Sequence, residues 1–81
     1  MNNISTEIRE AVRAADEAVY HAQLQNDPSY YEHSQKAIFH AEYLINQWKN
    51  SEHENTPPEI HHAEEMLRHV KETLVAISSL E

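Results

Sequence analysis

Hydrophobic residues recur every three or four positions through most of this chain, which is the period of an α-helix with one buried face. Two polar breaks that contain proline, at positions 26–28 and 50–59, interrupt the pattern. The chain is therefore expected to be all-α. The predicted helices cover residues 6–25, 28–50 and 57–80.

Both breaks carry signals for the start of a helix. Asp27 is suited to cap a helix whose first position is Pro28, where the missing N–H is not needed. Thr56 and Glu59 have the spacing of a capping box, with Pro57 at the first helical position. This second start is the strongest such signal in the chain.

Each predicted helix has one apolar face. The first face is mostly alanine, so a partner helix can approach it closely, although each alanine contributes little hydrophobic burial. The expected core positions of the first helix are Ile8, Ala11, Val12, Ala15, Ala18, Val19 and Ala22. Those of the second helix are Tyr31, Ser34, Ile38, Ala41, Ile45 and Trp48, widened by Tyr30, Ala37 and Leu44. Those of the third helix are Ile60, Ala63, Leu67, Val70, Leu74 and Ile77.

The lengths of the two breaks set the expected topology. The first connection is only a residue or two long, so the first two helices must form an antiparallel hairpin. The longer second connection lets the third helix return beside them. We expect a single domain over residues 1–81, folded as an antiparallel three-helix bundle. Because a core built from 81 residues is marginal, shared burial in a homodimer would add stability, and self-association is a further expectation.

Glycine and cysteine are both absent from the chain. Without glycine, the phosphate-binding fingerprints of P-loop and dinucleotide-binding proteins are excluded. Without cysteine, the chain has no disulfide, no thiolate for zinc and no thiol nucleophile, and it does not require an oxidising compartment. No cofactor is predicted.

Acidic residues dominate the charge, with 14 Asp and Glu against six Lys and Arg, which gives a formal net charge of −8. Nucleic acids and anionic membrane surfaces both require clustered basic residues, so neither is an expected partner. The N-terminus lacks a secretory signal, and no apolar stretch approaches the roughly 20 residues that cross a bilayer. We therefore expect a cytoplasmic location.

Histidine and glutamate on the third predicted helix are the only residues that suggest a metal site. His61, His62, Glu65 and His69 are spaced so that pairs of them share a helix face, and such pairs can bind zinc, nickel or copper. Glu59 and His62 also have the Glu-x-x-His spacing of di-iron bundles, but those sites need two such motifs. The alternative is a solvated helix face.

Two enzyme-like alternatives rest on short motifs. The segment His33-Ser34-Gln35-Lys36-Ala37 resembles the core of histidine phosphotransfer domains, which would make His33 the phosphorylated residue. The resemblance covers five residues and lacks the glycine of the family pattern. An all-α nucleotide pyrophosphohydrolase would need clustered carboxylates for magnesium, and Glu64-Glu65 is followed by Arg68, which fits better as an i,i+4 ion-pair partner of Glu64. No complete catalytic set is present, so we expect a protein that is not an enzyme.

Four large apolar residues lie outside the predicted core faces. They are Tyr20, Leu24, Phe39 and Tyr43. Together with the complete helical patterning, they suggest a protein-interaction or regulatory bundle that binds another protein, or a second copy of itself, through an apolar helix face. The sequence does not name that partner.

The alanine-rich segment 11–20 and the segment 30–37 give the chain a familiar organisation. In size and pattern it resembles the short uncharacterised all-helical cytoplasmic proteins of Bacillus-type bacteria. This resemblance implies a cytoplasmic helical bundle tied to sporulation or stress physiology. It transfers no catalytic residue, because such families have none assigned.

Overall fold

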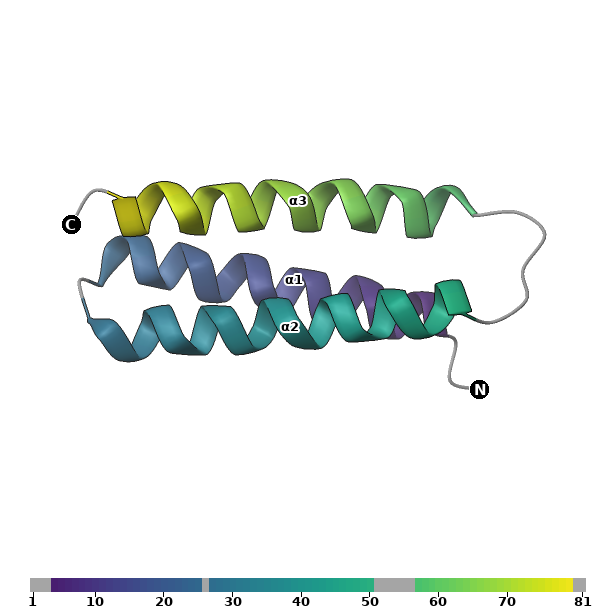
Figure 1. The fold of residues 1–81 in the computed structure, drawn as a ribbon, viewed down its shortest axis with the longest axis horizontal. Helices are drawn as coiled ribbons and strands as arrows, with labels where there is room; N and C mark the ends of the chain where they lie inside the picture. The colour runs from purple at the N-terminus through teal and green to yellow at the C-terminus, as the bar shows by residue number, and fades with distance from the viewer. Residues whose placement is uncertain (1–3, 26, 51–56, 80–81) are drawn as a thin grey trace.

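Three α-helices lie side by side in the computed structural model, which describes residues 4–25, 27–50 and 57–79 (Figure 1). The helices are α1 (Ile4–Leu24), α2 (Pro28–Asn50) and α3 (Pro58–Ser79). The chain runs in one direction along α1, returns along α2 and runs forward again along α3. The predicted all-α antiparallel three-helix arrangement is therefore confirmed, with helix ends within two residues of those expected.

The turn between α1 and α2 is closed by the predicted cap. The Asp27 Oδ1 atom accepts hydrogen bonds from the Ser29 backbone N–H at 3.0 Å and from the Ser29 hydroxyl at 3.1 Å. The Asp27 carbonyl accepts a further bond from the Tyr30 N–H. Pro28 takes the first helical position, where proline has no N–H to leave unpaired.

Helix α3 begins at Pro58, one residue later than predicted. The carbonyl of Pro57 accepts the first helical hydrogen bonds, from the N–H groups of Ile60 and His61, each at 3.1 Å. A residue that precedes proline avoids the helical conformation, so Pro57 takes the capping position and Pro58 starts the helix. Thr56, the expected cap, lies outside the described residues.

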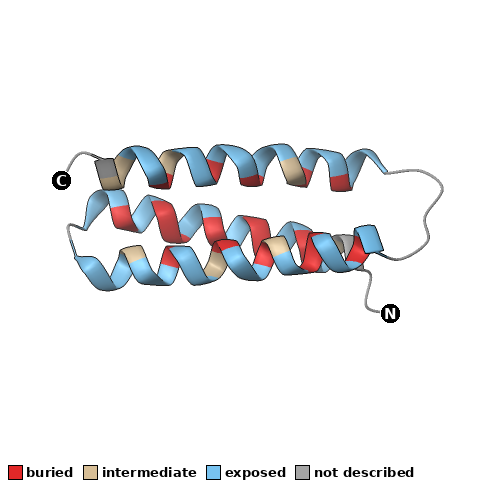
Figure 2. Cartoon of the chain, in the orientation of Figure 1, coloured by how far each residue is buried: buried red, intermediate tan, exposed pale blue. Residues whose placement is uncertain are grey.

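The core is one hydrophobic cluster to which all three helices contribute (Figure 2). Every predicted core position of α1 is buried, as are Trp48 on α2 and five of the six predicted positions on α3, while Ile77 is half-buried. Tyr30 is an error in the prediction, because 37% of it is exposed. It lies in the first turn of α2, where its ring stacks on that of His21 at 6.2 Å instead of entering the core.

Small side chains let α1 and α2 pack more closely than either packs against α3, and α2 and α3 approach each other least. The closest pair buries alanines of α1 together with Ala41 and Ser34 of α2, neither of which has any exposed surface. The Ser34 hydroxyl donates to the Tyr30 carbonyl of its own helix at 2.8 Å, so its burial leaves no unpaired donor. None of the described helices is both long enough and apolar enough to cross a membrane.

Candidate interaction groove

A groove runs between α2 and α3, where the two helices lie furthest apart. We call it the α2–α3 groove, and it has two parts that meet at Glu42 and Lys71. The larger part encloses about 500 Å³ and the smaller part about 270 Å³. The larger part is lined by Glu42, Ile45, Asn46, Lys49, Glu64, Leu67, Arg68, Lys71, Glu72 and Val75. The smaller part is lined by Tyr31, Gln35, Ile38, Phe39, Glu42, Lys71, Leu74 and Val75.

The base of the α2–α3 groove is part of the hydrophobic core. Ile38 and Ile45 of α2 and Leu67 and Leu74 of α3 line the groove and are at most 6% exposed. These large side chains keep the two helix backbones apart, in contrast to the alanines of α1. The groove therefore leads directly onto apolar atoms.

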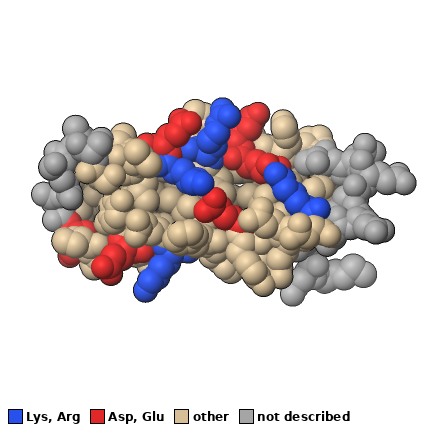
Figure 3. Space-filling model, viewed as in Figure 1, with Lys and Arg blue, Asp and Glu red and all other residues tan. Residues whose placement is uncertain are grey.

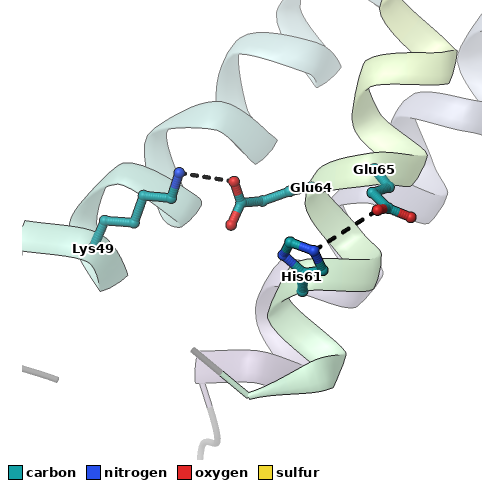
Figure 4. A network of polar contacts seen from close by, with 4 residues as sticks. All are labelled: Lys49, His61, Glu64 and Glu65. Atoms are coloured by element: carbon teal, nitrogen blue, oxygen red, sulfur yellow. Dashed lines mark ion pairs between the residues drawn. The ribbon is translucent and has the colours of Figure 1, made fainter. Parts of the chain in front are cut away.

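Two ion pairs bridge the groove. The Lys71 Nζ lies 2.8 Å from the Glu42 Oε2, and the Lys49 Nζ lies 2.7 Å from the Glu64 Oε2 (Figure 4). The expected pairing of Glu64 with Arg68 was wrong, because Glu64 faces α2 and reaches Lys49 instead. Arg68 Nε instead lies 3.9 Å from Glu72 Oε1, on an exposed face of α3.

Charge is balanced around this groove and unbalanced elsewhere. The charged residues lining it are three acidic and three basic ones: Glu42, Glu64, Glu72, Lys49, Arg68 and Lys71. The remaining described positions carry eight acidic side chains and only Arg9, Arg13 and Lys36 as basic ones. In Figure 3 red and blue side chains alternate over the region where α2 and α3 meet. The groove is thus the part of this acidic molecule that is least repulsive to another acidic surface.

The four predicted interaction residues are all exposed, but they do not share one surface. Phe39 is 69% exposed and lines the α2–α3 groove. Tyr20 is 57% exposed and lines a separate hollow together with Thr73 of α3, on the side where α1 and α3 meet. Leu24 and Tyr43 are also exposed, and the Tyr43 hydroxyl accepts a hydrogen bond from the Gln47 side chain at 2.8 Å. Of the four, only Phe39 is brought to the groove.

The sequence reasoning missed Val75, which is 65% exposed and lines both parts of the groove. Its signal was present in the sequence. Val75 directly follows the core residue Leu74, so the helical period turns it out of the core face, just as it does Phe39 after Ile38. The two exposed residues therefore stand on opposite walls of the groove.

The proposed metal ligands lie on the exposed surface of α3. His61 Nε2 is 3.8 Å from Glu65 Oε1, and both side chains are mostly exposed (Figure 4). His62 and His69 are also exposed. Within the described residues, no three histidine or carboxylate side chains gather into a group that could hold a metal ion. A metal site here stays a prediction, and it would need ligands supplied by rearrangement or by another molecule.

His33, the predicted phosphotransfer residue, is exposed on α2, and Lys36 is exposed one turn later. Exposure satisfies one requirement of phosphotransfer and discriminates little, since most polar residues on these helices are exposed. This role also stays a prediction.

Comparison with known proteins adds no relative: no family model, no curated protein and no solved structure matches this chain. The function is therefore argued from the geometry of the chain itself.

Proposed function

We propose that this protein is a non-enzymatic interaction module that binds a protein partner through the α2–α3 groove. The observation that supports it best is the pairing of Phe39 and Val75, which are 69% and 65% exposed on opposite walls above a buried apolar base. Large apolar side chains that border a groove with an apolar base are typical of protein-binding surfaces.

Burial of the exposed Phe39 and Val75 side chains would supply the favourable free energy of binding. Complete burial of a phenylalanine or valine side chain contributes roughly 1.5–3 kcal/mol. A partner that covers Phe39 and Val75 would gain about two thirds of this contribution from each, because the base residues are already buried, and this gain is set against the cost of association. Balanced charge along the walls removes the electrostatic penalty that the net charge of −8 would impose elsewhere.

The proposal includes a cytoplasmic location, as the composition and the resemblance to small helical proteins of Bacillus-type bacteria suggest. Fractionation of cells that express the chain from its own promoter would test this part. The same resemblance suggests a role in sporulation or stress physiology, which is tested by following the protein level through growth and sporulation.

Site-specific photo-crosslinking in cells tests the groove itself. A photoreactive phenylalanine analogue replaces Asn46, which lines the groove, or Arg13, an exposed residue of α1 that does not line it. We expect a discrete protein adduct from position 46 that is lost when Phe39→Ser and Val75→Ser are added. Equal labelling from positions 46 and 13, or no adduct from position 46, would overturn the proposal.

A further inference from the structure

We infer that the occupant of the α2–α3 groove is a second copy of this chain, so that the protein is a two-fold symmetric dimer. This inference rests on the proposed function of the groove and names the partner. Three observations support it: the placement of the exposed apolar residues along the groove, the charge of the face and its size.

The groove is self-complementary about the Glu42–Lys71 ion pair. On α2, Phe39 lies three residues before Glu42, and Ile45 of the base lies three residues after it. On α3, Leu67 of the base lies four residues before Lys71, and Val75 lies four residues after it. Because α2 and α3 are antiparallel, Phe39 and Val75 lie on one side of the ion pair together with Ile38 and Leu74 of the base, while Ile45 and Leu67 lie on the other.

Consider a two-fold axis that lies between the two copies and crosses both helices at the Glu42–Lys71 ion pair. This axis places the exposed Phe39 and Val75 side chains of one copy opposite the groove of the other. It brings Phe39 of each copy to the level of Ile45 in its partner, and Val75 to the level of Leu67. The larger part of the groove, about 500 Å³, extends from Val75 past the ion pair to Ile45, Leu67 and Lys49, and its end beyond the ion pair would receive the two side chains. Each copy gives and receives the same contacts, as a closed dimer requires.

Charge favours the groove for a second copy over the remaining described surface taken as a whole. Two chains of charge −8 repel when their acidic surfaces meet. The charged side chains that line the groove are three acidic and three basic ones, so this region adds no net charge when two copies meet, although the axis places Glu42 and Lys71 each opposite its own copy. A different acidic protein would meet the same neutral face, but it would not in general reproduce the spacing of Phe39 and Val75.

The groove lies on the broad face of the bundle, along two helices of 23 and 22 residues that are each about 33–35 Å long at 1.5 Å per residue. A standard interface buries about 800 Å² on each partner, so this face is large enough for a stable dimer. The dimer would also share burial between two small cores, whose α1 faces are mostly alanine.

Sedimentation equilibrium of the full chain tests the association. We expect a dimer whose dissociation constant rises at least tenfold on Phe39→Asp, because the charge would enter the apolar interface. Leu24→Asp is the control, since it places the same charge on an apolar residue of α1 that is 63% exposed and lines neither part of the groove, and it should change the constant less than twofold. Circular dichroism checks that both variants remain helical. A monomer at all concentrations, or equal weakening by both variants, would overturn the dimer.

Disulfide trapping tests the symmetry, and the chain has no cysteine of its own to interfere. The Glu42→Cys chain places a thiol at the axis, so it should link to its own copy under mild oxidation, whereas Arg13→Cys on α1, which does not line the groove, should not. Trapping of both variants at equal rates would overturn the proposed axis. If the chain is a monomer but the photo-crosslinker at position 46 still forms an adduct with a different protein, the dimer is overturned and the proposed interaction function is retained. A monomer without that adduct would sink both.

Discussion

The contact between α1 and α2 and the contact between α2 and α3 are built from different residues, although α2 takes part in both. Against α1, small buried side chains such as Ala15 and Ser34 allow the helices to approach closely. Against α3, leucine and isoleucine form the base, the helices stay further apart, and two ion pairs cross the remaining space. One contact is closed to other molecules, and the other is open.

This difference separates the residues that hold the fold from those available for binding. Alanines in the closed contact stabilise the fold because they let the two helices pack closely, and they leave no exposed surface for a partner. The larger residues of the open contact pack against the core on one side only, and an apolar groove lies on their other side. The closed contact should therefore be sensitive to added volume, and the open contact should tolerate it.

The largest expected effect comes from filling the closed contact. Ala15 has no exposed surface, so Ala15→Leu would force extra methyl groups into a packed space and should lower the free energy of unfolding by about 1–3 kcal/mol. Asn46→Phe also adds three heavy atoms, but to an exposed residue of the open groove, and should change the free energy of unfolding by less than about 0.5 kcal/mol. Urea unfolding followed by circular dichroism measures both. Similar losses in the two variants would show that the groove is as tightly packed as the α1–α2 contact.

A smaller effect is expected at the turn that joins the two helices of the closed contact. Asp27→Ala removes the side-chain acceptor of the Ser29 N–H and should cost about 1 kcal/mol of stability. Asp27→Asn retains an oxygen acceptor and should lose only a few tenths of that amount. Thermal and urea unfolding check both variants. If asparagine and alanine destabilised the protein equally, the hydrogen bond would not be the source of the effect.

The smallest effect is expected from the ion pairs of the open contact. The Lys71 and Glu42 side chains are 49% and 33% exposed, so water and salt weaken their attraction. A double-mutant cycle with Glu42→Gln and Lys71→Met, made in the Phe39→Asp chain so that no second copy covers the pair, should give a coupling energy below about 1 kcal/mol, falling further in high salt. A salt-independent coupling of several kcal/mol would mean that the pair is far less hydrated than its exposure indicates.

Much of this architecture was predictable because it depends on local patterns. The seven predicted core positions of α1 follow the helical period and are all buried, and the Asp27–Pro28 start depends on neighbouring residues only. The prediction that Tyr30 is a core residue was wrong because Tyr30 lies in the first turn of α2, where it extends beyond the core. The helical period does not indicate how close a residue lies to the end of a helix.

The groove was harder to predict, since it depends on how far apart two helices lie. The ion pair between Glu42 and Lys71 joins residues 29 positions apart, and no spacing rule within a helix identifies it. The same limit applies to Glu64, whose partner Lys49 lies on another helix instead of one turn away. Phe39 was identified as exposed, but its pairing with Val75 appears only once α2 and α3 are placed together.

The alanine face of α1 has a consequence for the register of the bundle. Ala11, Ala15, Ala18 and Ala22 follow one another at steps of four, three and four residues, so sliding α1 along α2 by one turn would largely exchange alanine for alanine. Ser34 adds no directional restraint across the contact, because its hydroxyl is bonded within its own helix. The correct alignment must then come from the larger residues Ile8, Val12 and Val19 and from the turn capped by Asp27. Because this turn is short, it limits how far α1 can slide along α2.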